Sequence, residues 1–175
     1  MRAEPDRLPT DLETDNPLWH FALTFWNIPG VESACLALQQ KGWSVTRILS
    51  ACWLTITGQK YADREDNTVT EWRIHVTEPL RSARQYIPRN HPGTNSLRGD
   101  IARTELEAER IELALVYQSL AETQKENAGM YGSEQLARTN LEAAAPETAM
   151  DSETRHTVDA LSRSLMTFSA GNRES

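Results

Sequence analysis

The chain has 175 residues, of which 39% are hydrophobic and 25% are charged, and its formal net charge is −7. This length suits one domain with an appendage, and the modest hydrophobic share indicates a core built from only part of the chain. The acidic balance argues against general nucleic-acid binding, which needs clustered and uncompensated cations.

The first segment, residues 1–15, is polar, holds five acidic residues and is predicted to be a disordered leader. It has no apolar run of the kind that a signal peptide needs. No stretch of the chain approaches the roughly 18 consecutive apolar residues of a membrane-spanning helix. We therefore expect a cytoplasmic protein with no membrane association, whose two cysteines are free thiols.

Apolar residues at helical spacing predict a series of helices from Pro17 onward. Asn16-Pro17 is a typical helix start, and Gly42 and Gly58 are typical stops after the second and third helices. Pro79 should kink or break the fourth helix near Thr77. The expected ranges are 17–27, 31–40, 44–57, 68–77, 79–87 and 97–126.

The C-terminal part is less apolar, and helices are expected there at 133–145 and 152–168. In the first of these only Leu136 and Leu141 are large and apolar. The sequence therefore predicts an all-α protein. It should comprise a compact bundle of about five helices over residues 16–126 and a loosely attached, partly helical extension over residues 127–175.

Residues that could carry chemistry are sparse. Cys35 and Cys52 lie in apolar helical contexts, which favours a structural role over a reactive one. Glu71 and His75 stand four residues apart, but a metal site needs two further ligands, and an exposed helical pair is the simpler interpretation. We predict no catalytic residue, no metal and no cofactor.

The charge is uneven along the chain, because residues 72–103 carry a net +4 between acidic flanks of −4 and −7. All six basic residues of this belt are arginines, and Arg73, Arg81 and Arg84 are the candidate binding residues. The planar guanidinium suits carboxylates and phosphates. Two interpretations stay open: the arginines bind an external anion or acidic partner, or they pair internally with acidic residues of the flanks.

Several short motifs occur together in a characteristic order. They are Trp19-x-Phe21, Pro29-Gly-Val31, Ala34-Cys-Leu-x-Leu-Gln39, Gly42, Trp53-Leu54, Trp72, Pro79-Leu-Arg81 with Arg84, and Glu105-Leu-Glu-Ala-Glu-Arg110. In this combination, over roughly residues 17–125, the chain resembles a family of small proteobacterial proteins of unknown function. The resemblance implies a bacterial, cytoplasmic, helical protein and carries over no catalytic residues.

The absence of a catalytic constellation in the sequence favours a non-enzymatic helical protein that acts through a protein partner or through self-association, with nucleic acid disfavoured. The alternative is a small enzyme or anion-binding protein that uses the arginines near the Pro79 helix break.

Overall fold

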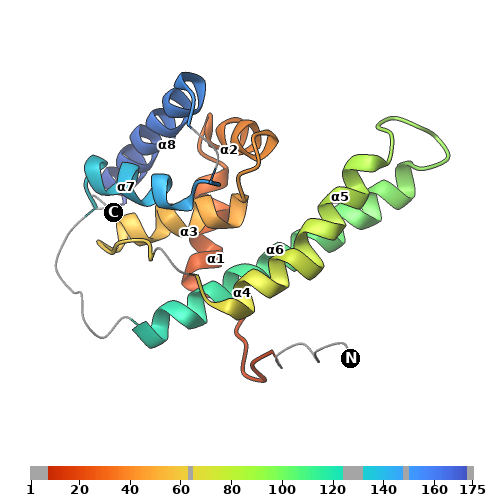
Figure 1. Ribbon diagram of the computed structural model, residues 1–175, viewed down its shortest axis with the longest axis horizontal. Coiled ribbons are helices and arrows are strands. Elements are labelled where there is room, and N and C mark those ends of the chain that lie inside the picture. The colour runs from red at the N-terminus through yellow and green to blue at the C-terminus, as the bar shows by residue number, and fades with distance from the viewer. Residues whose placement is uncertain (1–7, 63–64, 124–131, 148–149, 173–175) are drawn as a thin grey trace. The chain divides into compact units, whose positions relative to one another are not determined.

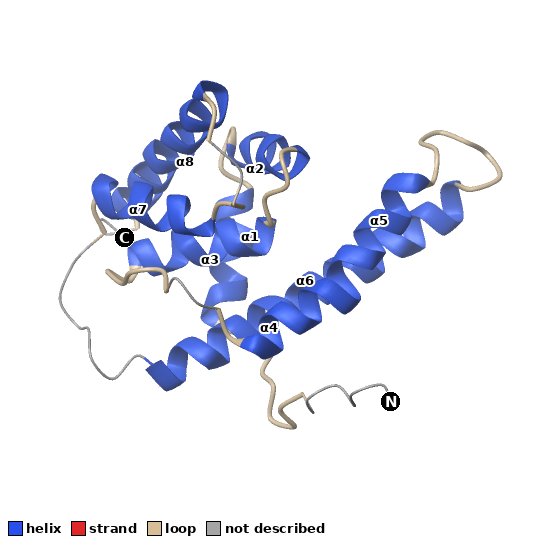
Figure 2. Cartoon of the chain, in the orientation of Figure 1, coloured by secondary structure: helices blue, strands red, loops and turns tan. Residues whose placement is uncertain are grey.

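Helices make up the regular structure throughout the part of the chain that the computed structural model describes, namely residues 8–62, 65–123, 132–147 and 150–172. Figure 2 shows no strand among them, so the predicted all-α class is confirmed. In chain order the elements are α1 (Pro17–Trp26), α2 (Val31–Gln40), α3 (Val45–Ile56), α4 (Asn67–Trp72), the π-helix η1 (Arg73–Thr77), α5 (Glu78–Tyr86), α6 (Asn95–Thr123), α7 (Glu134–Ala144) and α8 (Ser152–Gly171).

Local signals explain most helix ends. The Ser44 side chain accepts a hydrogen bond from the backbone N–H of Arg47 at the start of α3, and Ser133 accepts one from Leu136 at the start of α7. Gly42, which follows α2, has a φ of 89°, a left-handed conformation that favours glycine. The start of α1 at Pro17 and the stop at Gly42 agree with the predicted ones.

The chain divides into two units. The five-helix unit comprises residues 17–64 and 123–175, and the hairpin unit comprises residues 1–16 and 65–122. This division differs from the predicted boundary at residue 126. The helices α7 and α8 belong to the same unit as α1, α2 and α3 and are not a loosely attached extension.

In the five-helix unit, α3 is the central element and contacts the other four helices. The rings of Phe21 and Phe25 stack with centroids 5.3 Å apart, and Phe168 of α8 packs edge-on against both. Leu141, Leu161 and Leu165 are at most 1% exposed, so the C-terminal helices supply part of this core. Burial of these leucines stabilises the packing of α7 and α8 with α1, α2 and α3.

One buried amide ties α7 to α3 and to the chain that follows it. Asn140 donates to the backbone oxygen of Gln59 (2.9 Å) and to Oγ1 of Thr55 (3.0 Å), and it accepts from the N–H of Tyr61 (2.8 Å). Gly132 lies so close to α3 that a Cβ there would come within 2.4 Å of the backbone oxygen of Thr55. Small and hydrogen-bonding residues, rather than large apolar ones, therefore permit the close approach of this segment.

In the hairpin unit, α4, η1 and α5 form one helical run that lies antiparallel to α6, as Figure 1 shows. We call these four elements the hairpin. The predicted break near Thr77 is instead a π-helical turn, in which the N–H of Glu78 bonds to the backbone oxygen of Arg73. Proline cannot donate to the preceding turn, and the wider turn accommodates Pro79 without ending the helix.

The predicted disordered leader, residues 1–15, is only partly within the described range. Its residues 8–15 are described, and among them the backbone oxygen of Thr14 accepts a 3.1 Å hydrogen bond from Nε of Arg110 on α6. Residues 1–7, the expected end of the long helix at 124–126 and the last residues 173–175 lie outside the described residues.

No single helix in the described ranges is long and apolar enough to cross a membrane. The pair α1 and α2 satisfies that test only jointly and is bent by 99° at its break.

Candidate functional site

The three arginines singled out by the sequence all lie on the α4–η1–α5 side of the hairpin and point toward α6. They belong to a row of residues at heptad-like spacing, Arg73, Thr77, Arg81 and Arg84, and the facing row on α6 consists of Glu105, Glu109 and Glu112. We call these seven residues the seam. The interior of the hairpin is therefore largely ionic, where an ordinary helical pair would place leucines.

Arg73 is the most buried arginine of the seam. Its Nε donates to Oε1 of Glu112 over 2.7 Å, and its Nη1 and Nη2 donate to the two carboxylate oxygens of Glu65, at 2.5 and 2.8 Å. The Arg73 side chain is 8% exposed and that of Glu112 is 0% exposed. Burial opposes the charge of Arg73, but the bonds to Glu65 and Glu112 outweigh it and raise the pKa of the guanidinium.

The next two arginines share a carboxylate. Arg81 donates from Nε to Glu105 (3.1 Å) and from Nη2 to Glu109 (2.7 Å). Arg84 donates to both oxygens of Glu105, from Nε to Oε2 and from Nη2 to Oε1. The hydrogen bond to Glu105 is the main cause of a raised pKa for Arg84. Burial, with the neighbouring carboxylates of Glu105 and Glu112, raises the pKa of Glu109 above its usual value despite the opposing charge of Arg81.

This pairing bears directly on what the arginines can do. The three guanidinium groups already bind one or two carboxylates each, and the Arg73, Arg81 and Arg84 side chains are only 8%, 11% and 18% exposed, so an external anion has little access to them. The observed geometry is therefore that of internal pairing, one of the two interpretations that the sequence left open. Arg81, which binds both Glu105 and Glu109, and Arg84, which binds Glu105, link α5 to α6 along the seam.

The other sequence candidates occupy ordinary structural roles. His75 and Glu71 form an exposed pair (Nε2 to Oε2, 3.1 Å), and no group of three potential metal ligands occurs among the residues that the structure describes. Cys35 and Cys52 are free and fully buried. Burial raises the pKa of the Cys35 thiol to about 12, and it also raises that of Cys52, so neither has the depressed pKa of a reactive thiol.

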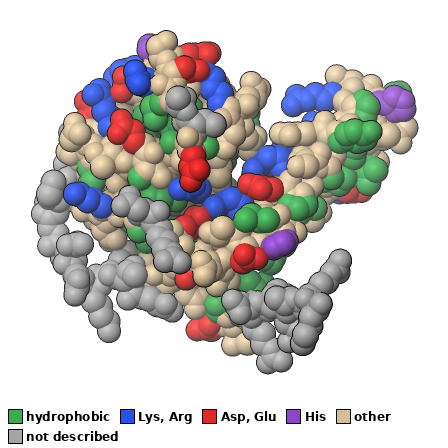
Figure 3. All heavy atoms as spheres, viewed as in Figure 1, with side chains coloured by type: hydrophobic (Ala, Val, Ile, Leu, Met, Phe, Trp, Pro, Cys, Tyr) green, Lys and Arg blue, Asp and Glu red, His purple; other side chains and the backbone are tan. Residues whose placement is uncertain are grey.

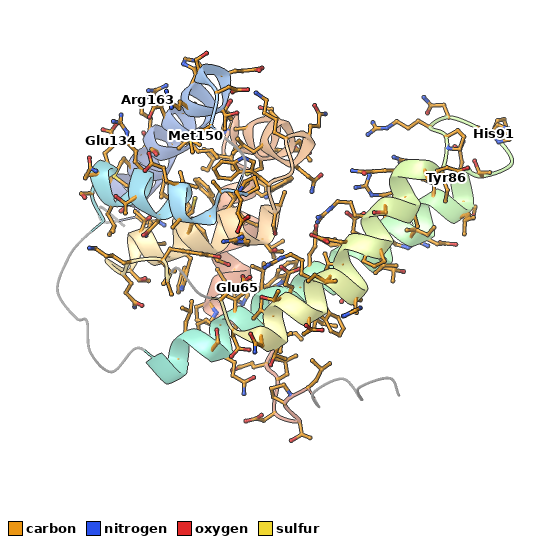
Figure 4. The ribbon with its side chains drawn as sticks, viewed as in Figure 1. Glu65, Tyr86, His91, Glu134, Met150 and Arg163 are labelled. Carbon is orange, nitrogen blue, oxygen red and sulfur yellow. The ribbon has the colours of Figure 1, made fainter. Side chains whose placement is uncertain are left out.

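A surface that the sequence did not single out lies at the distal end of the hairpin, where the loop of residues 87–94 joins α5 to α6. Tyr86 is 91% exposed and Leu97 is 55% exposed. Figure 4 places Tyr86 and His91 at this end and Glu65 at the other. Figure 3 shows hydrophobic, basic and histidine side chains together there. The signal in the sequence was the helical spacing of the apolar residues Leu97 and Ile101.

These observations define the class of the chain as an all-α protein with an ionic helical hairpin. The DUF2390 family, whose description is "protein of unknown function", matches residues 17–116. The chain belongs to this family, and the predicted membership of an uncharacterised family is thereby confirmed. No curated protein and no solved structure matches the chain. The matched range includes α1 to α5 and most of α6 but neither α7 nor α8.

Proposed function

We propose that this chain is a non-enzymatic interaction protein, in which the seam holds the hairpin together and the outer surface of the hairpin contacts a protein partner. The observation that carries the proposal is that Arg73, Arg81 and Arg84 all bind carboxylates within the hairpin, while large apolar side chains of the same hairpin are exposed. Exposed apolar residues that gather at one place are typical of protein-binding surfaces.

The alternative, an enzyme or anion-binding protein built on the three arginines, requires guanidinium groups that a ligand can reach. Breaking the existing ion pairs to free them would leave buried carboxylates without a partner, which is costly. We therefore infer that the three arginines stabilise the hairpin and do not themselves bind the partner. Titration calorimetry with inorganic phosphate and with citrate tests the alternative, and we expect no saturable heat.

A photo-cross-linking amino acid at position 86 tests the proposal in living host cells. Tyr86 is the most exposed of the large hydrophobic residues described in the hairpin, at 91%, so its replacement should not disturb the fold. We expect discrete protein adducts that disappear when Leu97→Glu is added. The matched control is a cross-linker at position 155, an exposed site on α8. The proposal would be contradicted if the cross-linker at position 86 gave no adducts, or if positions 86 and 155 gave the same adducts.

A further inference from the structure

We propose that the partner of the hairpin is a second copy of this chain, and that two hairpins pair antiparallel through one apolar face. This inference rests on the proposed function and specifies the partner. The face is formed by Leu80, Ala83 and Ile87 on α5 and by Leu97, Ile101 and Thr104 on α6, and we call these six residues the apolar face.

Helical geometry places both stripes on the same side of the hairpin. On α5 the stripe residues Leu80 and Ala83 come immediately before the seam residues Arg81 and Arg84, and on α6 Thr104 comes immediately before Glu105. In two antiparallel helices, the positions that precede the facing residues lie on the same flank of the pair. Trp72 and Ala108 continue this flank toward the other end of the hairpin, where Nε1 of Trp72 donates to the backbone oxygen of Ala108 (2.9 Å).

The spacing on each helix is that of a helix-packing surface. Residues 80, 83 and 87 and residues 97, 101 and 104 follow the alternating three- and four-residue steps of a heptad repeat. The seam occupies the contact between α5 and α6, so these stripes lie beside that contact and keep part of their surface exposed. Leu97 is 55% exposed, and Leu80, Ile87 and Ile101 are partly exposed. Two such faces placed together form a four-helix arrangement that buries them all.

The distribution of charge identifies a second copy as the occupant and gives its orientation. The distal end of the hairpin carries Arg89 and Arg98, with Arg103 bound to Asp100. Among the described residues of the hairpin unit, five exposed acids lie toward the opposite end, namely Asp11, Glu13, Asp15, Asp66 and Glu71, while the exposed Glu78 and Glu107 lie between the two ends. An antiparallel pair about a two-fold axis places the basic end of each hairpin beside the acidic end of the other, whereas a parallel pair places like charges together. The hairpin is thus complementary to itself in one orientation.

The oligomeric state of the full chain is the first test. In sedimentation velocity over about a hundredfold range of concentration, we expect a monomer–dimer equilibrium. Thr104→Glu should raise the dimer dissociation constant about tenfold or more, because it places two carboxylates near the two-fold axis. Thr104 is exposed, so this variant should fold normally. Ser82→Glu, an exposed site on α5 outside the apolar face, is the matched control and should leave the dimer unchanged.

Single cysteines report the orientation. The native thiols are buried with raised pKa values, so a short bifunctional maleimide should react only with an introduced one. Thr104 ends the apolar face on α6 but lies near the middle of the whole flank, which continues through Ala108 and Trp72, so Thr104→Cys should cross-link to its own copy. Leu97→Cys lies seven residues away, so its two copies in an antiparallel pair are about 20 Å apart and should not react. Leu106→Cys, on the opposite flank, is the control for random collision.

A chain that stays monomeric throughout, or a dimer that Thr104→Glu leaves intact, overturns the self-pairing. A cross-link at Leu97→Cys or Leu106→Cys in preference to Thr104→Cys overturns the antiparallel face. These outcomes are distinguishable from failure of the proposed function. A monomer that still gives adducts to another protein from position 86 retains an interaction role, whereas a monomer without such adducts loses both.

Discussion

Arg73 and Glu112 meet across the hairpin, where Nε of the guanidinium lies 2.7 Å from Oε1 of a carboxylate that is 0% exposed. Two charges removed from water in this way stabilise the fold only while both are present. Replacing only one of the two residues should therefore destabilise the hairpin, because the other charge stays buried without its partner.

Arg73→Met should lower the free energy of unfolding by about 3 kcal/mol, because it leaves Glu112 ionised and buried without its counter-charge. Urea denaturation followed by circular dichroism measures the change. Adding Glu112→Leu to Arg73→Met should restore part of the loss, because the fully buried charge is then removed and only Glu65, which is 15% exposed, is left without its partner. A double variant that loses as much as the two single variants together would contradict this account. Arg103→Met, at a side chain that is 76% exposed, is the control and should change stability by less than about 0.5 kcal/mol.

Glu109→Gln should leave the protein at least as stable as the wild type at neutral pH. The folded-state pKa of Glu109 is raised, mainly by burial, so the folded chain binds this proton more tightly than the unfolded chain does. The stability that the proton contributes is present below the unfolded pKa and is lost as the pH rises through the raised folded pKa. Glutamine resembles the protonated form, so the advantage of the variant should vanish in acid. Urea midpoints measured across that pH range test this, and a variant weaker than the wild type at neutral pH would contradict it.

Asn140→Leu should destabilise the five-helix unit by about 2–3 kcal/mol, because the Tyr61 N–H and the Gln59 carbonyl would lose their buried partner. Thermal unfolding measures the loss. Thr139→Ala changes the exposed neighbouring residue on α7 and should have little effect. If α7 were a loosely attached extension, the two substitutions would be equally mild.

The helix ends were predictable because their causes are local. Ser44, Ser133, Gly42 and Pro17 each act within one turn of chain, so a short stretch of sequence contains the whole signal. The π-helical turn before Pro79 was not predictable. The sequence shows that proline removes one helical hydrogen bond, but it does not show how the helix adapts to that loss.

The long-range features were the harder part. The place of α7 depends on Asn140 and on small residues such as Ala137, which a search for large apolar side chains passes over. Charged residues usually lie on the surface, so the hydrophobicity pattern predicts that the charged residues of the seam are exposed. They are buried because α6 packs against the α4–η1–α5 side of the hairpin. The sequence identified the arginines and the acids as potential partners, but it could not decide between internal and external pairing.

The two thiols should react only when the five-helix unit opens. The Cys35 pKa of about 12 leaves almost no thiolate at neutral pH, and the raised pKa of Cys52 has the same effect, while both side chains are 0% exposed. With Ellman's reagent in native buffer we expect very slow release of the chromophore, and in urea we expect rapid reaction of two thiols per chain. Asn140→Leu should accelerate the native reaction, because it weakens the contacts of α3, which carries Cys52, with α7. A thiol that reacts fast in the folded wild type would contradict the structural role and would point instead to a nucleophile.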